Sequence, residues 1–143
     1  MKMGVLVLLA DMLKGLLPVL LAKHLQFDGF ATALVGLLAV VGHMYPIFYR
    51  FKGGKGVATA LGVIVALYWP AALLGFAVMV LVVALTRYVS LGSILASIAV
   101  AVLIGSTHCN EILPISLMTV LIIWRHRANI QRLLRGEENR FGG

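Results

Sequence analysis

Residues 42–59 read Gly42-His43-Met44-Tyr45-Pro46-Ile47-Phe48-Tyr49-Arg50-Phe51-Lys52-Gly53-Gly54-Lys55-Gly56-Val57-Ala58-Thr59, the longest polar interruption between the apolar segments of this chain. The stretch combines three cations, a histidine and four glycines. Glycine lets backbone N–H groups approach a ligand closely and adopts positive φ at little cost. Where such a loop leads directly into a helix, its N–H groups and the helix dipole attract anions. This Gly-rich loop therefore predicts a phosphate or carboxylate site at the edge of a membrane.

Two other interpretations of the Gly-rich loop compete with an anion site. A nucleotide-binding P-loop requires Gly-Lys-Ser/Thr after a β-strand. Here Lys55 is followed by Gly56, and the flanking segments are typical of membrane helices, so that motif is excluded. A positively charged loop can also do no more than fix the orientation of a membrane protein. Composition alone leaves the anion site and the orienting loop both open.

The composition predicts an integral membrane protein. Of the 143 residues, 62% are hydrophobic and 12% are charged, and the mean hydropathy is +1.04. Soluble domains average nearly half apolar residues and about a quarter charged ones. We expect a single transmembrane domain over residues 1–143.

Charge and cysteine content limit which partners and covalent or metal sites the chain can have. The net charge of +7 does not indicate a nucleic-acid partner, because the basic residues punctuate apolar segments and collect near the C-terminus. The lone Cys109 excludes an intrachain disulfide and suggests no cysteine-based metal site. The first apolar run carries Asp11 and Lys14 in its middle and lacks a small-residue cleavage pattern downstream, so no cleavable signal peptide is predicted.

Six apolar segments predict an all-α polytopic bundle of about six transmembrane helices. They cover residues 3–22, 30–42, 57–69, 71–86, 90–106 and 112–124. A helix needs about 20 residues to cross about 30 Å of hydrocarbon, so we expect the shorter helices to extend into their loops or to face a thinned bilayer. Segment 57–69 is the weakest candidate for a full span, and Pro70 is expected to open the next helix.

The distribution of lysine and arginine predicts that both termini are cytoplasmic. With six crossings, Lys23 is the one basic residue outside, while Lys14 lies within the first segment. The cytoplasmic side receives Lys2, Arg50, Lys52, Lys55, Arg87, Arg125, Arg127, Arg132, Arg135 and Arg140. Cytoplasmic loops carry such an excess of positive charge. The Gly-rich loop, the Arg87–Ser93 turn and the C-terminal basic segment are then expected to meet at one face.

Two polar groups lie within or beside the apolar segments. Asp11 and Lys14 are three residues apart and can pair on one helix face, which makes them either a functional pair, as ionisable residues inside a membrane often are, or a self-neutralising one. Ser90 begins the fifth segment, where it can cap the helix. The alternative for Ser90 is a hydroxyl directed at the cytoplasmic anion site.

The C-terminal segment Trp124–Glu138 has two faces if it is helical. Arg125, Asn129 and Arg132 share a polar face, and Ile130, Leu133 and Leu134 form an apolar stripe. One interpretation is an amphipathic helix at the lipid interface. The other involves His126, whose side chain suits proton transfer near neutral pH. A metal site on His43 and His126 is disfavoured, because no carboxylate or cysteine completes it on the same face.

Two motifs carry a family resemblance. Gly42-His43-x-x-Pro46-x-Phe48-x-x-Phe51-Lys52-Gly53-Gly54-Lys55-Gly56-Val57-Ala58-Thr59 resembles the second signature motif of the bacterial acyl-phosphate-dependent glycerol-3-phosphate acyltransferases, the PlsY family. Arg125-His126-x-x-Asn129-Ile130-x-Arg132-Leu133-x-x-Gly136-x-Glu138 resembles the third. Asp11-x-x-Lys14-Gly15-x-x-Pro18 and Ser90-Leu91-Gly92-Ser93 are similar to intervening segments, so the resemblance covers essentially the whole chain.

The resemblance implies a reaction and a place. A fatty acyl group would pass from acyl phosphate to the 1-hydroxyl of sn-glycerol 3-phosphate, giving lysophosphatidic acid and inorganic phosphate in bacterial phospholipid synthesis. The enzyme would lie in the bacterial inner membrane with its active face cytoplasmic and its acyl chain between helices. It would need no cofactor or metal and is expected to be a monomer in membrane lipid.

The resemblance also implies the site residues. His126, Asn129 and Ser90 would act at the reaction centre, with His126 either the base or an orienting group. The substrate-binding residues would be His43, Lys52, Gly53, Gly54, Lys55, Gly56, Thr59 and Arg132.

One departure from the family pattern concerns the front of the chain. Family members have seven helices and a first motif, Ser-Gly-Asn-x-Gly-Ala-Thr-Asn, that has no counterpart here. The chain is therefore expected to be a family member truncated at its N-terminus. The alternatives are an inactive remnant or a non-catalytic membrane protein such as a transporter, although a transporter would be expected to have an internal repeat or polar residues at the midplane.

Overall fold

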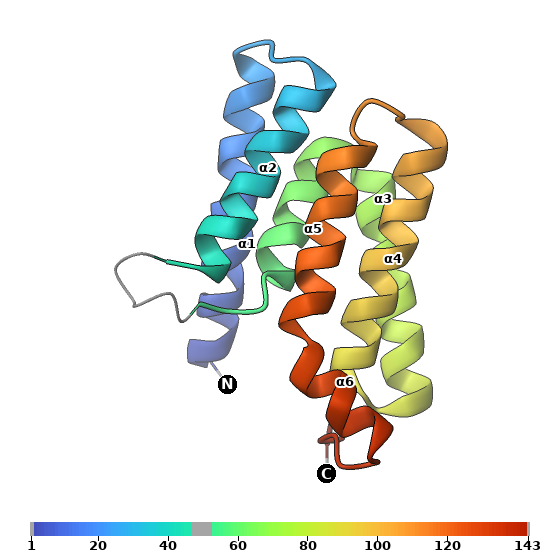
Figure 1. Cartoon of the computed structure of the whole chain (residues 1–143). Helices are drawn as coiled ribbons and strands as arrows, with labels where there is room; N and C mark the ends of the chain where they lie inside the picture. Colours follow the sequence, from blue (N-terminus) through green and yellow to red (C-terminus); the bar gives the residue numbers. More distant parts are fainter. Residues whose placement is uncertain (1, 47–52, 143) are drawn as a thin grey trace.

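The computed structural model describes residues 2–46 and 53–142 and is helical throughout its regular elements (Figure 1). The helices are α1 (Lys2–His24), α2 (Gly29–Met44), α3 (Val57–Thr86), α4 (Val89–Thr107), α5 (Ile112–Arg125) and α6 (Arg127–Leu134). The predicted all-α class is confirmed. Helices α1, α3 and α4 are long and apolar enough to cross a membrane, whereas α2 and α5 are shorter apolar helices.

Helix α3 consists of two arms that fold back on each other. Its backbone leaves the helical region at Tyr68, where φ is −153° and ψ is 88°. Pro70 follows at once, in the first turn of the second arm, where a missing N–H breaks no helical hydrogen bond. Figure 1 shows the first arm rising through the bundle and the second returning beside α4. The predicted segments 57–69 and 71–86 are thus separate helical arms.

Small residues let α1 and the first arm of α3 touch along their backbones. A Cβ added at Gly15 would overlap the carbonyl of Thr59, and one added at Gly62 would overlap that of Met12. Because lipid is as apolar as the helix surfaces, no hydrophobic force drives transmembrane helices together, and close packing of this kind holds them in contact. The core around this contact includes Val19, Val40, Met44, Val63 and Ile115, all of them almost fully buried.

The outer surface of the bundle is apolar, as a lipid-facing surface must be. Exposed side chains there include Leu6, Leu17, Leu38, Phe76, Leu81 and Val102.

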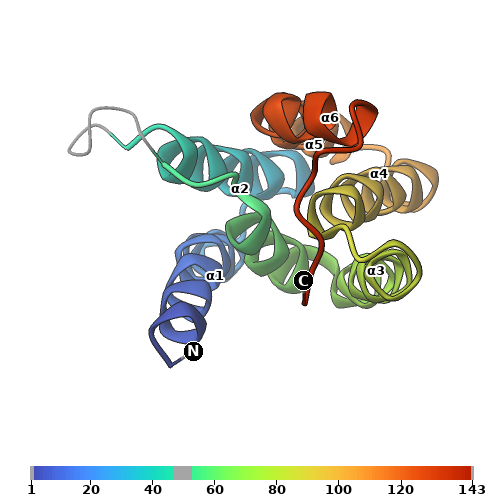
Figure 2. The ribbon, with the colours of Figure 1, turned by 90° about the horizontal axis from the view of Figure 1, so that it is seen from below.

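Four segments that are distant in sequence meet at one end of the bundle. Figure 1 shows both chain termini, the end of α2, the start of α3 and α6 at this end, together with the turn between α3 and α4. Figure 2, which views the molecule from below, shows the C-terminal tail crossing the face of the bundle between the start of α3 and the α3–α4 turn. The Gly-rich loop, the Arg87–Ser93 turn and the C-terminal segment therefore lie together, as the sequence predicts.

Candidate functional site

A cavity of about 550 Å³ opens at the loop end of the bundle. Its walls come from α1, α2, the loop before α3, the first turns of α3 and α4, α6 and the C-terminal tail. Seven of the predicted site residues line it: His43, Gly54, Lys55, Gly56, Ser90, His126 and Asn129. Segments separated by more than a hundred residues thus contribute to one site.

Three helix N-termini point their first turns at this cavity. Val57 and Ala58 begin α3, Val89 and Ser90 begin α4, and Asn129 lies in the first turn of α6. Free N–H groups and the positive end of the helix dipole favour an anion at each N-terminus. These helix ends favour an anion in the cavity, although the carboxylates of Asp11 and Glu138 also line it.

The start of α3 shows why the loop before it ends in glycine. Gly56 has a φ of +82° and precedes the helix without a side-chain cap. A left-handed backbone conformation of this kind suits glycine. A Cβ at Gly56 would also collide with the side chain of Met44, which is buried at the end of α2. The first N–H groups of α3 are thus left for a ligand, because no side chain caps them.

Lys55 brings a full positive charge to the cavity. Burial lowers its pKa, the charge of Glu138 opposes that effect, and the charge of Arg132 adds to it. A partly dehydrated ammonium attracts an anion more strongly than one in bulk water, because the local dielectric constant is lower. Lys55 is therefore well placed to contact a phosphate in the cavity.

Glu138 connects three of the predicted site residues. Its Oε1 accepts hydrogen bonds from Ser90 Oγ at 2.7 Å and from Asn129 Nδ2 at 2.6 Å. Its Oε2 accepts one from Arg132 Nε at 2.7 Å. Burial alone would raise the pKa of this carboxyl, but the hydrogen bonds from Asn129, Ser90 and Arg132 and the charge of Arg132 outweigh burial and lower the pKa to about 2. Glu138 is ionised and holds all three side chains in fixed positions.

Sequence reasoning included Glu138 in a motif but assigned it no role. The available signal was the Gly136-x-Glu138 spacing next to a run of arginines. The contact with Ser90 spans 48 residues and follows only from the folded chain. Arg132, predicted to bind substrate, reaches the site here through Glu138.

His126 lines the cavity, and its ring is fixed by a hydrogen bond to the backbone. The residue is 2% exposed, and its Nδ1 lies 2.8 Å from the backbone oxygen of Ile122. A carbonyl oxygen only accepts, so Nδ1 carries the hydrogen and Nε2 keeps a free lone pair. Burial lowers the pKa of His126, the hydrogen bond to Ile122 partly offsets this, and the charge of Lys55 lowers it further. The neutral imidazole is thus the form present at physiological pH.

His43 and Gly54 line the cavity and pack against each other. His43 Nδ1 lies 3.5 Å from Asp11 Oδ1, the same oxygen that accepts a 2.7 Å hydrogen bond from Lys14 Nζ. The Asp11–Lys14 pair expected from the sequence is confirmed. A Cβ at Gly54 would collide with His43 Nε2, so the loop lies directly against the imidazole.

Two further predicted binding residues do not line this cavity. Gly53 packs against the backbone at the end of α2 and lines a neighbouring cavity with His43 and Gly54. Thr59 is fully buried against Gly15, and its hydroxyl has no hydrogen-bond partner among the described residues. Lys52 falls outside the described residues. Within residues 2–46 and 53–142 no three histidine, cysteine or acidic side chains gather as metal ligands would.

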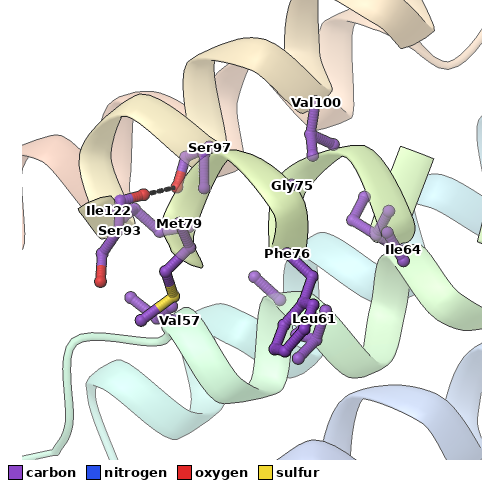
Figure 3. A pocket seen from close by; sticks show the side chains of 13 residues that line it. Val57, Leu61, Ile64, Gly75, Phe76, Met79, Ser93, Ser97, Val100 and Ile122 are labelled. Atoms are coloured by element: carbon purple, nitrogen blue, oxygen red, sulfur yellow. Dashed lines mark hydrogen bonds between the residues drawn. The ribbon is translucent and has the colours of Figure 1, made fainter. Parts of the chain in front are cut away.

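A small apolar cavity of about 80 Å³ lies close to the polar one, and Figure 3 shows the side chains that line it. It lies between the two arms of α3 and against α4, with Leu61, Phe76 and Val100 among its lining residues. Val57 and Ser93 line both cavities. A ligand with an anionic head and an apolar chain can therefore occupy the two cavities at once.

The C-terminal tail covers the polar cavity. The Phe141 N–H donates to the Arg87 carbonyl at 2.7 Å, and the Arg140 guanidinium lies over the Tyr88 ring at 5.6 Å from its centroid. Arg140 and Phe141 both line the cavity. No sequence pattern indicated that these residues contribute to the site.

Comparison with known proteins reveals close relatives. Residues 1–136 match the family model described as Glycerol-3-phosphate acyltransferase. The glycerol-3-phosphate acyltransferase of Pseudomonas putida KT2440 is 49% identical over 140 residues, which cover 98% of this chain and 74% of that protein. The protein of the same name from Pseudomonas entomophila L48 is 45% identical with the same coverage.

Solved structures show the same fold. The crystal structure of PlsY, an integral membrane glycerol 3-phosphate acyltransferase, in its glycerol 3-phosphate form matches with a TM-score of 0.93 at 46% identity, over 99% of this chain and 72% of that one. Its lysophosphatidic acid form gives the same TM-score and identity over 74% of that chain. The family resemblance carried by the two motifs is confirmed. The chain therefore belongs to the glycerol-3-phosphate acyltransferase family of integral membrane enzymes.

Proposed function

We propose that this chain transfers a fatty acyl group from acyl phosphate to the 1-hydroxyl of sn-glycerol 3-phosphate. The products are lysophosphatidic acid and inorganic phosphate. The observation that carries the proposal is the union of an anion-binding cavity, a neutral histidine within it and an adjoining apolar cavity. Both substrates bear phosphate, and one of them also bears an alkyl chain.

The cavity supplies contacts for both phosphates. Lys55 and the N–H groups around Gly54 and Gly56 would hold the phosphate of glycerol 3-phosphate, with Gly53 and His43 beside them. The motif assigns Lys52 to the same phosphate. The N-termini of α4 and α6 would face the phosphoryl group of the donor. Arg132 would act through Glu138. Thr59 would support the loop from its buried position in the first turn of α3.

The chemistry needs positioning more than covalent catalysis. Acyl phosphate is already activated, so the hydroxyl oxygen attacks the acyl carbonyl carbon directly and the bond from that carbon to the phosphate oxygen breaks. Holding the two reactants in line and stabilising the developing charge provides most of the rate. Ser90 and Asn129, fixed by Glu138, would contact the reacting groups.

Two acceptors are available for the hydroxyl proton. His126 Nε2 has a free lone pair and lines the cavity. An oxygen of the departing phosphate is the other acceptor, in which case His126 only orients the hydroxyl. If His126 is the base, His126→Ala lowers turnover by about 10²–10⁴-fold, the usual range for general base catalysis. A much smaller loss assigns the proton to the phosphate.

The acyl chain would leave the polar cavity past Val57 and Ser93. The adjoining apolar cavity is small, so it accepts the first methylene groups, and the rest of the chain would lie along the lipid-facing surface of α3 and α4. The carbonyl would then lie at the boundary between the two cavities.

We also infer that the loop end faces the cytoplasm of a bacterial cell, in the inner membrane. Arg87, Arg125, Arg127 and Arg135 lie at this end, whereas Lys23 lies at the other, where it donates to the Leu67 carbonyl. Positive charge favours the cytoplasmic side.

The test is acyl transfer by the purified 143-residue chain in lipid, with acyl phosphate and labelled glycerol 3-phosphate. A second chain would carry the helix and first motif that the family resemblance places before residue 1. We expect labelled lysophosphatidic acid from the shorter chain. Product from the extended chain alone would show that the described residues are insufficient, and product from neither would refute the proposal.

A further inference from the structure

The guanidinium of Arg125 contacts the Gly-rich loop at two consecutive carbonyls. Its Nη2 donates to Gly53 O at 2.7 Å and to Gly54 O at 3.1 Å, and its Nε donates to Gly54 O at 3.3 Å. The same guanidinium lies over the Tyr45 ring, 5.2 Å from the centroid. Arg125 is thus attached both to the end of α2 and to the residues that precede α3.

A trans peptide unit is planar, with its C=O and N–H pointing in opposite directions. The peptide unit that carries Gly53 O also carries the N–H of Gly54, and the unit that carries Gly54 O carries the N–H of Lys55. When one guanidinium holds both carbonyls, both N–H groups turn away from it. Successive N–H groups on one side of a chain form a concave anion site.

The polar cavity borders the loop residues that follow these two carbonyls. Gly54, Lys55 and Gly56 line it, whereas Arg125 is not one of its lining residues. Elsewhere Gly53 lies flush against the backbone of His43 and Met44, and a second cavity of about 500 Å³ borders Gly53 and Gly54. If these peptide units were free to rotate, they would present carbonyl oxygens to the cavity as readily as N–H groups. Carbonyl oxygens repel a phosphate.

Arg125 also ties the loop to the element that carries His126. It is the last residue of α5, and His126 follows it at the start of α6. Adjacent residues thus diverge, one toward the loop and one into the cavity. The position of Lys55 relative to His126 depends on this connection.

We propose that Arg125 is a positioning residue that orients the Gly53–Gly54 and Gly54–Lys55 peptide units so that their N–H groups and Lys55 bind the phosphate of glycerol 3-phosphate. This inference rests on the proposed function for its substrate, while the phosphate contact itself does not require turnover. Arg125 would thus support substrate binding through the loop, without contacting the substrate itself.

The test compares Arg125→Ala and Arg125→Lys with Arg127→Ala. Arg127 is a matched control, since it stacks on Trp124 and donates to the Trp124 carbonyl, with no hydrogen bond to Gly53 or Gly54. We expect Arg125→Ala to raise the KM for glycerol 3-phosphate about tenfold, the loss expected for charge-assisted hydrogen bonds. The KM for acyl phosphate and the melting temperature should change little. Arg125→Lys should be intermediate, because an ammonium lacks the planar fork, and added guanidinium ion should partly restore Arg125→Ala.

Phosphate binding provides a second readout that is independent of catalysis. Line broadening of inorganic phosphate in ³¹P NMR should report binding to the unsubstituted chain and to Arg127→Ala, with about a tenfold weaker affinity in Arg125→Ala. This result without turnover would refute the proposed function but support the role of Arg125. Unchanged phosphate affinity and KM in Arg125→Ala would overturn that role. The role would also be overturned if Arg125→Ala raised the KM for both substrates equally and lowered the melting temperature. It would be overturned as well if the unsubstituted chain bound no phosphate.

Discussion

Replacing Glu138 with glutamine should destabilise the protein without changing its shape. The carboxylate accepts three short hydrogen bonds, and its side chain is 6% exposed. A glutamine has one oxygen and one NH₂ group. If its oxygen serves Ser90 and Asn129, its NH₂ faces the Arg132 Nε–H, so that two donors meet and one charge-assisted bond is lost.

The pKa of Glu138 gives the size of the effect. Its decrease from 4.5 to about 2 means that the folded state prefers the charged carboxyl. At about 1.4 kcal/mol for each pKa unit, this preference contributes about 3 kcal/mol to the free energy of unfolding. Glu138→Gln should lose about that amount at neutral pH. Glu137→Gln is the control, because Glu137 is exposed, and it should stay within about 0.5 kcal/mol of the unsubstituted chain.

The pH dependence of stability gives a second signature with a fixed sign. A carboxyl whose pKa is lowered on folding stabilises the protein above its unfolded pKa, here 4.5, and this stabilisation disappears as the pH falls toward about 2. The measurement is the free energy of unfolding in mixed micelles between pH 7 and pH 2. The unsubstituted chain should lose about 3 kcal/mol more than Glu138→Gln below pH 4.5. Equal stability of the two at pH 7, with parallel acid profiles, would refute this account of Glu138.

Three further changes test other parts of the site and the fold. Lys55→Ala should weaken use of glycerol 3-phosphate by about 2–3 kcal/mol in kcat/KM, the worth of a charge-assisted contact, whereas Lys23→Ala at the opposite end should not; equal effects would remove Lys55 from the phosphate site. If His126 is the base, the acid limb of the pH profile of kcat/KM should lie below pH 6.5, because burial lowers the pKa of His126. A His126-dependent limb above 6.5 would contradict the lowered pKa. Gly62→Ala should cost about 1–3 kcal/mol of stability by separating α1 from α3, while Gly4→Ala, with nothing within 4 Å of the added Cβ, should cost none; thermal unfolding of the pair decides, and equal stability would contradict the close contact.

The sequence predicted most of the helices because apolar runs must be helical in a bilayer. Pro70 correctly marked the start of the second arm of α3, since proline is tolerated where the first N–H groups lack partners. The residue at which the chain reverses, Tyr68, carries no such mark. Its backbone leaves the helical region although the residue is neither proline nor glycine.

The site was harder to predict than the fold because its residues meet through tertiary contacts. Motif spacing indicated the loop, Ser90 and the His126 segment, but not that Glu138 would hold Ser90, Asn129 and Arg132 together. Thr59 illustrates the limit of reasoning from position in a motif. It follows the cavity-lining Ala58 by one residue, yet a helical step of about 100° turns it toward α1.

The break at Tyr68 also determines whether the chain crosses the membrane an even or an odd number of times between Lys55 and His126. As one straight helix, α3 would be 30 residues long, or about 45 Å at 1.5 Å per residue, well beyond the hydrocarbon thickness. It would count as a single crossing, and α4 and α5 would then deliver His126 to the side of the membrane opposite Lys55. With the reversal the number of crossings between these two residues is even, so both emerge on the same side. One non-helical residue thus decides whether the two halves of the site can meet at all.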